Sequence, residues 1–126
     1  PPPGVTVAGA VASLQPELER ADVSVGPLRS GAGTRLKVVE AMANRLPVVS
    51  TAIGCEGIDV SDGVHLLVAD DAAAFARSCI RAVSDASLRA DLIAAAEARY
   101  LETYQWSTIR ERVAALADQV SERRRS

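Results

Sequence analysis

The sequence predicts an α/β fold in which helices cover both faces of a parallel β-sheet. Short runs of Val, Leu and Ile alternate with helical segments along the 126 residues, as in chains built from strand–helix–strand units. The runs are almost continuously apolar, which suits strands that are buried on both faces. Only 3% of the residues are aromatic, so aliphatic side chains and Ala must fill the core. Together these observations indicate one Rossmann-like domain.

Four apolar runs are expected to form the strands. Each run is bounded by residues that readily end strands, and the runs are residues 5–8, 22–27, 46–50 and 65–69. Open parallel sheets bind their ligands beyond the carboxyl ends of the strands. The search for a functional site therefore narrows to the segments that follow these strands, which are residues 9–13, 27–34, 50–57 and 70–71.

Two helices are expected between the first three strands. The first covers residues 14–21, where Pro16 is acceptable because it lies in the first turn. The second helix covers residues 34–45 and has one apolar face, which we expect to pack on the sheet. That face consists of Leu36, Val39, Met42 and Ala43.

The last part of the chain is expected to be helical. Asp70 or Asp71 caps a helix that ends near Ser84, and a second helix covers residues 87–102. Ser107 is expected to cap a final helix with one apolar stripe. That stripe consists of Ile109, Val113, Leu116 and Val120.

Composition and charge exclude several classes of function. Fourteen basic and sixteen acidic side chains give a net charge of -2, which argues against a general nucleic-acid-binding protein and against binding to an anionic membrane surface. The arginines at 123–125 are expected to form a solvated helix end. No apolar run approaches the roughly 20 residues of a membrane span, and residues 1–4 do not resemble a signal peptide.

The cysteine and histidine content also limits the chemistry. Cys55 and Cys79 are expected to be free thiols in a cytoplasmic, reducing compartment. His65 is the only histidine and is interpreted as structural. A zinc site needs more ligands than these residues supply, so no metal site is predicted. The chain begins without Met and is expected to be a piece of a longer protein.

The strongest candidate site is the glycine-rich segment that leads into the second helix. Small residues at 30–33 let the backbone approach a bulky anion closely, and the free N–H groups at the start of a helix favour phosphate. The segment lacks the Gly-Lys-Ser/Thr of a P-loop and the three glycines of a dinucleotide fingerprint. The alternative is a tight turn that only packs the helix on the sheet.

The sequence around this loop resembles a known family. It reads Gly-Ala-Gly-Thr-Arg-Leu-Lys-Val-Val-Glu-Ala-Met-Ala at residues 31–43 and Leu-Pro-Val-Val-Ser-Thr at residues 46–51. Both segments are similar to the donor-binding half of retaining glycosyltransferases of family GT4, which have the GT-B fold. Further similar segments, in the same order, are residues 7–11, 18–23, 54–58, 62–68 and 104–106. The resemblance implies that residues 1–126 are a partial nucleotide-sugar-binding domain from the C-terminal half of a GT-B fold. The acceptor domain and the start of the donor domain are expected to be absent.

The resemblance also implies roles for individual residues. Glu40 matches the second acid of the family's two-glutamate signature, which accepts hydrogen bonds from ribose hydroxyls. The alternative is an exposed ion pair with Lys37. Ala32 stands where the signature has its first acid, and this departure leaves the donor sugar open. The diphosphate is expected to be held by Gly31, Ala32, Gly33, Thr34, Arg35 and Lys37. The loop expected to shape the nucleotide pocket carries Ser50, Thr51, Gly54 and Glu56.

The function implied by the resemblance is transfer of a sugar to an acceptor hydroxyl, with retention at the anomeric carbon. The donor is expected to be a nucleoside diphosphate sugar of the UDP or GDP type, and no metal ion or other cofactor is implied. Polysaccharide or glycolipid synthesis is the expected setting. The chain alone is expected to be inactive, because the acceptor domain would complete the cleft. Two alternatives remain: a sugar-nucleotide epimerase of the same fold, and a non-catalytic nucleotide-binding or interaction module.

The last helix has its own expectation. In the GT-B family this helix often crosses to the other domain, so its apolar stripe is expected to be partly exposed here and to favour self-association. Trp106, which precedes this helix, is expected to pack it against the domain. The expected partners are therefore the nucleotide sugar, the absent acceptor domain and a second copy of the chain, with no nucleic acid.

Overall fold

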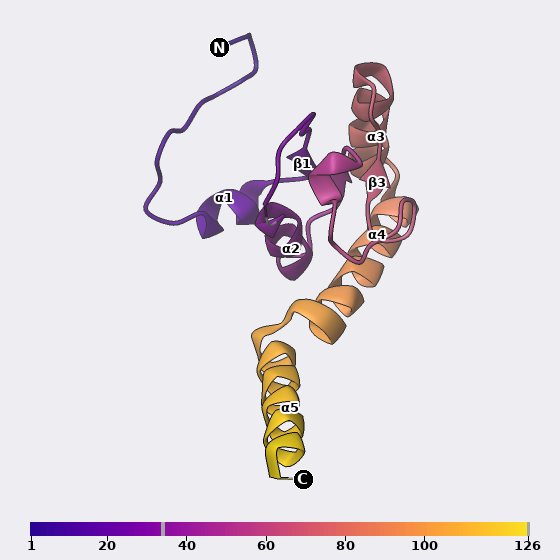
Figure 1. Ribbon diagram of the computed structural model, residues 1–126. Coiled ribbons are helices and arrows are strands. Elements are labelled where there is room, and N and C mark those ends of the chain that lie inside the picture. The colour runs from indigo at the N-terminus through magenta and orange to yellow at the C-terminus, as the bar shows by residue number, and fades with distance from the viewer. Residues whose placement is uncertain (34, 126) are drawn as a thin grey trace.

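A computed structural model describes residues 1–33 and 35–125 of the chain (Figure 1). Helices and short strands alternate up to β3, and helices follow it. In chain order the elements are α1 (Gln15–Arg20), β1 (Ser24–Gly26), α2 (Leu36–Ala43), β2 (Val48–Ser50), a 3₁₀ turn (Ile53–Cys55), β3 (Leu67–Val68), α3 (Ala72–Ser84), α4 (Ala86–Arg99), a π turn (Tyr100–Tyr104) and α5 (Trp106–Arg125).

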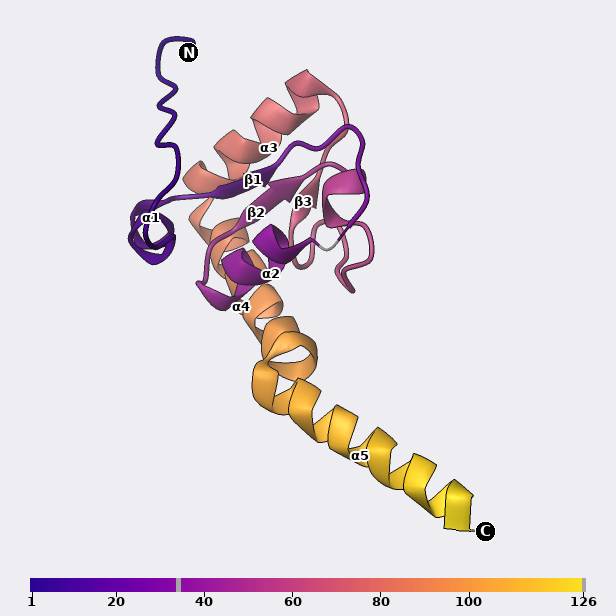
Figure 2. The ribbon, with the colours of Figure 1, turned by 60° about the vertical axis from the view of Figure 1, so that its left-hand side comes forward.

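The sheet is parallel, as predicted. Its strands lie side by side in the order β1-β2-β3 (Figure 2). Ser24 pairs with Val48, and Val49 pairs with Leu67. Three of the four expected strand segments each contain one observed strand, although each strand is shorter than its apolar run. All three strands therefore end at the same edge of the sheet.

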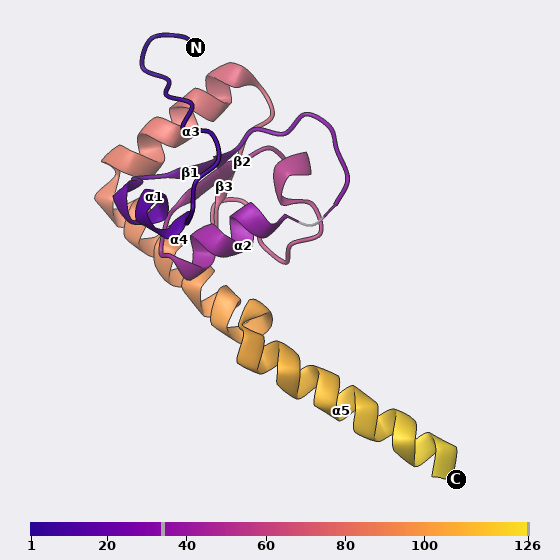
Figure 3. The same ribbon diagram turned by 90° about the vertical axis from the view of Figure 1, so that its left-hand side faces the viewer.

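Helices cover both faces of this sheet, which confirms the predicted α/β architecture. Val48 and Val49 are neighbours on β2, so their side chains point to opposite faces. Val48 packs with residues of α2, among them Met42. Val49 packs with Ala82 of α3 and Leu92 of α4. Figure 3 shows α2 on one side of the strands and α3 on the other.

The prediction of a strand at residues 5–8 was wrong. The described residues before α1 form no strand and are all exposed, including Val7 at 76%. In Figure 1 this indigo segment runs away from the sheet. A β-strand requires backbone hydrogen bonds to a neighbour, which an apolar run alone does not supply. Among the described residues the sheet therefore has three strands, with β1 at its edge.

The expected apolar face of α2 was also partly wrong. The helix buries Val38, Ala41 and Met42, whereas Leu36 is 62% exposed and Ala43 is exposed. The helix begins at Leu36 because Arg35, its N-cap, has a non-helical backbone conformation. The expected face and the face that is actually buried both carry apolar side chains, so the sequence pattern does not distinguish them. Which face is buried depends on the direction from which the helix meets the sheet.

The predicted break between the two helices at 84–87 is confirmed. Asp71 caps α3 by accepting a hydrogen bond from the Ala74 N–H at 2.8 Å. Asp85 ends α3 and caps α4 by accepting from the Leu88 N–H at 3.0 Å. Ser107 is not a cap, because α5 already begins at Trp106.

The helix α5 extends away from the rest of the chain (Figure 1). None of its residues is buried, and Val113, Leu116 and Val120 are more than half exposed. The expected exposure of the apolar stripe is therefore confirmed, while self-association remains a prediction. Among the described residues, no helix is both long and apolar enough to cross a membrane.

Candidate functional site: three loops at the carboxyl edge of the sheet

Three loops meet where the parallel strands end. The Thr51 hydroxyl donates a hydrogen bond to the Leu28 carbonyl at 2.5 Å and joins the loops after β2 and β1. The Ala52 N–H donates to Asp70 Oδ1 at 2.9 Å and joins the loops after β2 and β3. These are the predicted segments 27–34, 50–57 and 70–71. The fourth predicted segment, 9–13, follows no strand and is exposed.

The glycine-rich loop lies on the surface and leads into α2. Gly31 has φ 129° and Gly33 has φ 119°, conformations that side-chain-bearing residues rarely adopt. Ala32 between them is exposed. Among the described residues, the N–H groups of Leu36 and Lys37 at the start of α2 have no backbone partner outside the helix, whereas the Val38 N–H donates to the Arg35 carbonyl at 3.1 Å. The predicted anion-binding backbone is therefore accessible. Thr34, predicted to add a hydroxyl, lies outside the described residues.

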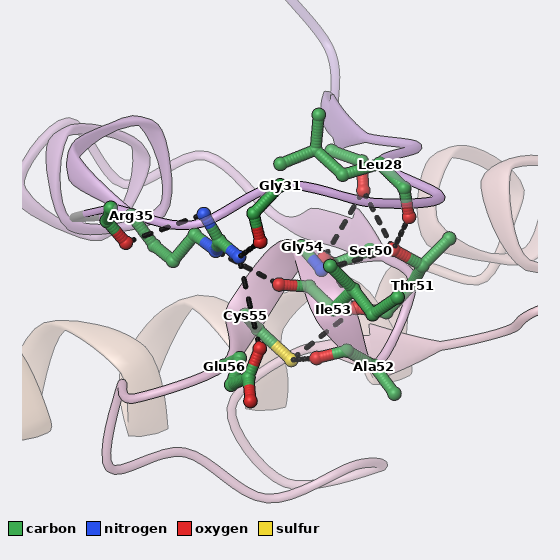
Figure 4. Close-up of polar contacts among 12 residues, drawn as sticks. Leu28, Gly31, Arg35, Ser50, Thr51, Ala52, Ile53, Gly54, Cys55 and Glu56 are labelled. Atoms are coloured by element: carbon green, nitrogen blue, oxygen red, sulfur yellow. Dashed lines mark hydrogen bonds and ion pairs between the residues drawn. The ribbon is translucent and has the colours of Figure 1, made fainter.

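The Arg35 side chain forms hydrogen bonds to the glycine loop after β1 and to the turn after β2 (Figure 4). Its Nε–H donates to the Ile53 carbonyl at 2.9 Å, and its Nη groups donate to the carbonyls of Gly33 at 3.3 Å and Gly31 at 3.2 Å. Glu56 Oε2 lies 3.8 Å from Nη2. Only 7% of the Arg35 side chain is exposed, against 72% of the Glu56 side chain. The guanidinium thus binds protein carbonyls from a buried position.

Ser50, Thr51 and Gly54 lie beneath the loops. The Ser50 hydroxyl is fully buried and donates to the Thr51 carbonyl at 2.8 Å. Thr51 Oγ1 accepts a hydrogen bond from the Gly54 N–H at 3.0 Å. In this arrangement the two hydroxyls bind backbone groups, as Figure 4 shows. These residues can shape a pocket, and their contact with a ligand remains a prediction.

Lys37 and Glu40 lie exposed on α2. Within residues 1–33 and 35–125, no ion pair joins them, so the alternative of a Lys37–Glu40 pair is not what the structure shows. Lys37 lines a cleft of about 190 Å³ between β1 and the start of α2. Both side chains line a second cleft of about 300 Å³ between α1, β1 and α2.

A third cleft, next to Glu40, is lined in part by aromatic side chains. This cleft of about 360 Å³ lies between α2, the π turn and α5, and its lining includes Glu40, Tyr100, Tyr104 and Trp106. Trp106 is 73% exposed, so the expectation that it packs α5 against the domain was wrong. Tyr104 instead anchors a loop, because its hydroxyl accepts a hydrogen bond from the Asp59 N–H at 2.8 Å.

Two titratable side chains outside these clefts, Cys55 and His65, are poorly suited to catalysis. Burial raises the pKa of the Cys55 thiol, and a protonated thiol is a weak nucleophile. Burial, with the Arg99 charge as a further cause, lowers the pKa of His65. His65 precedes β3 and therefore lies at the amino edge of the sheet, opposite the three loops. Cys55 and Cys79 are both free thiols, as predicted.

Sequence reasoning found the loops but missed how they are joined. The carbonyls of Leu28 and Ile53 and the carboxylate of Asp70 hold the site together. A backbone carbonyl has no sequence signature, so no pattern could have identified the first two. Among the described residues, no group of three or more His, Cys, Asp or Glu side chains could hold a metal ion.

The sequence of the chain was compared with protein families and with known proteins. The family model described as "Glycosyl transferases group 1" matches residues 2–85, a span that contains all three loops. A Klebsiella pneumoniae protein described as "Uncharacterized 44.6 kDa protein in cps region" is 41% identical over 58 residues. That match covers 46% of this chain and only 15% of the relative. No solved structure matches the chain. Because the family model covers more than half of the sequence, the chain belongs to the group 1 glycosyl transferases.

Proposed function

We propose that this chain binds the nucleoside diphosphate sugar donor of a retaining glycosyltransferase. Its family membership supports a transferase of sugars. In this proposal, residues 1–126 belong to the C-terminal, donor-binding half of a GT-B enzyme of the GT4 type, and another domain holds the acceptor. The relative from a cps region supports a role in polysaccharide synthesis, and UDP or GDP is the expected nucleotide.

The observation that carries the proposal is the exposed glycine loop at the start of α2. Gly31 and Gly33 are exposed and carry no side chain, so the backbone of the loop is open at the surface. The loop lies at the carboxyl edge of a parallel sheet, where such folds bind ligands. The positive end of the α2 dipole favours an anion at this position. A diphosphate is therefore the group that this loop is best suited to hold.

Glu40 supports the nucleoside part of the proposal. It lies five residues after Arg35, about 7–8 Å further along the helix axis, a span that a ribose 5′-diphosphate covers. Its exposed carboxylate can accept hydrogen bonds from both hydroxyls of a ribose. Lys37 lies on α2 between the loop and Glu40 and supplies a positive charge near the diphosphate.

In the proposed reaction, the bond between the anomeric carbon and the diphosphate oxygen breaks. The electron pair leaves with the diphosphate, where the helix dipole and the loop N–H groups stabilise the developing negative charge. The acceptor hydroxyl oxygen forms the new bond to the anomeric carbon, and its proton passes to an oxygen of the departing diphosphate. The loop provides no carboxylate for the sugar, because Ala32 stands where related enzymes have an acid.

The test is titration of the isotope-labelled chain with UDP, GDP, ADP and their sugar conjugates, followed by backbone amide shifts. Shifts confined to residues 31–40 and 50–57 would support the proposal and identify the nucleotide. Glu40→Gln should weaken binding about tenfold or more, because hydrogen bonds to a charged acceptor are lost. Glu111→Gln, an exposed glutamate on α5, is the matched control and should bind normally. Unchanged affinity of the Glu40 variant would remove Glu40 from the site.

A further inference from the structure

Arg35 is the only charged residue that is buried among residues 1–33 and 35–125. It occupies the N-cap position of α2, at the centre of the proposed donor site. Burial of a guanidinium requires hydrogen-bond partners to replace water. Its partners are three backbone carbonyls, and its nearest carboxylate oxygen, of the exposed Glu56, is 3.8 Å away.

The three carbonyls come from two different loops. Gly31 and Gly33 belong to the glycine loop after β1, and Ile53 begins the 3₁₀ turn after β2. The guanidinium is planar and its N–H groups point in fixed directions. It therefore holds the two loops at one separation and in one orientation.

This contact also decides which way the glycine loop presents its peptides. The Gly31 carbonyl points toward Arg35, so in a trans peptide the Ala32 N–H points the opposite way. Among the residues that the structure describes, none accepts a hydrogen bond from the Ala32 N–H. The positive φ angles at Gly31 and Gly33 accompany this arrangement.

We propose that Arg35 is a positioning residue that preforms the anion-binding loop of the donor site without touching the donor. The inference rests on the proposed function, because the loop is taken to bind the diphosphate. It differs from the sequence-based expectation, in which the Arg35 charge binds the phosphates directly. Arg35 acts through the peptides of residues 31–33, which its guanidinium orients.

Exchange of Arg35 for Lys separates positioning from direct contact. A lysine keeps the positive charge but has a single nitrogen, which cannot reproduce the fork that reaches two loops. Direct phosphate contact predicts that Arg35→Lys binds nearly as well as the wild type and that Arg35→Gln does not. Positioning predicts that both variants lose affinity for UDP or GDP to a similar extent, roughly tenfold or more.

Arg89 offers a matched control. Its Nη1 donates to the carbonyls of Asp22 at 2.5 Å and Ala82 at 3.5 Å. Asp22 lies before β1, so this arginine also joins elements through carbonyls, but at the amino edge of the sheet. Arg89→Lys and Arg89→Gln should reduce thermal stability while leaving nucleotide affinity unchanged. A loss of affinity in these variants equal to that at Arg35 would overturn the inference.

Measurements on the wild-type chain cover the case in which the Arg35 variants do not fold. The Nε–H resonance of Arg35 should exchange slowly with water before any nucleotide is added, because it is buried and bonded to Ile53. Saturating UDP or GDP should shift the amides of residues 31–33 much more than this resonance. Rapid exchange in the free protein, or a larger shift of the Nε–H signal, would overturn the inference. If neither nucleotide binds, the proposed function is overturned instead. Slow exchange of the Arg35 Nε–H would in that case still show that Arg35 holds the two loops together.

Discussion

Gly54 leaves no room for a β-carbon beside the carbonyl oxygen of Gly26. A β-carbon at residue 54 would stand 2.4 Å from that oxygen and 2.3 Å from Ser50 Oγ. Gly26 ends β1 and Gly54 lies in the turn after β2, so this contact sets how closely two of the three loops of the candidate site approach each other. Position 54 therefore requires glycine, because there is no space for a side chain.

Gly54→Ala should therefore destabilise the fold by about 2–3 kcal/mol, the upper part of the usual range for overpacking that moves backbone. Gly26→Ala is the graded comparison, since its added β-carbon would lie 3.3 Å from Ser50 Oγ and should cost about 1 kcal/mol or less. Urea denaturation measures both. Equal midpoints for the two variants would contradict the close approach at residue 54.

His65 should make stability depend on pH. Its Nδ1 accepts a hydrogen bond from the Ser61 N–H at 3.0 Å, and burial lowers its pKa below 6.5. The unfolded chain therefore binds more protons than the folded chain below about pH 6.5, and stability falls as the pH drops through that range. His65→Asn keeps an acceptor for Ser61 and should lack this decline. Denaturation midpoints between about pH 7.5 and 5.5 test this, because His65 is the only histidine.

Leu92 and Leu116 should respond very differently to truncation. Leu92 is fully buried on α4 beside Val49 and Ala82, so Leu92→Ala should cost about 2–5 kcal/mol. Leu116 is 60% exposed on α5, so Leu116→Ala should change stability by less than about 0.5 kcal/mol. A large loss at Leu116 at low protein concentration would show that α5 packs on the domain.

Asp85 should contribute a measurable helix cap. Its carboxylate accepts a hydrogen bond from the Leu88 N–H at the start of α4, and Asp85→Ala should cost about 1 kcal/mol. Asp91→Ala, on the exposed side of the same helix, removes an equal charge without a cap and should be nearly neutral or stabilising. Thermal denaturation of the two variants distinguishes a capping effect from a charge effect.

Much of the fold followed from local patterns. The cap at Asp71 is a short-range interaction between a carboxylate and an N–H three residues later, so the sequence could narrow it to Asp70 or Asp71. Asp85 was placed in the predicted break between two helices, but its role as the cap of α4 was not predicted. The three parallel strands were located because continuous apolar runs between helices suit strands buried on both faces. Residues 5–8 have a similar local pattern, yet they form no strand because no neighbour pairs with them.

For the candidate site, too, local features could be predicted from the sequence and contacts between distant segments could not. The glycine loop was predicted from a local pattern, because glycines before a helix are a local feature. The roles of Lys37 and Glu40 were implied by the resemblance to glycosyltransferases; the family match agrees with that resemblance, and the two roles remain predictions. The position of Arg35 in the sequence was equally clear, but its hydrogen-bond partners were not. Two of them lie within four residues, and the third is eighteen residues away on another loop.

The sequence by itself thus determined the α/β class, the order of helices and strands from α1 onward, and the segment that leads into α2. Only the tertiary structure decided which face of α2 is buried, that the Arg35 guanidinium binds carbonyls of two loops, and that Gly54 must lack a side chain. The physical reason is the distance along the chain over which each interaction acts. Periodicity, capping and glycine conformations act within a few residues, whereas burial and backbone contacts depend on the direction in which distant segments meet.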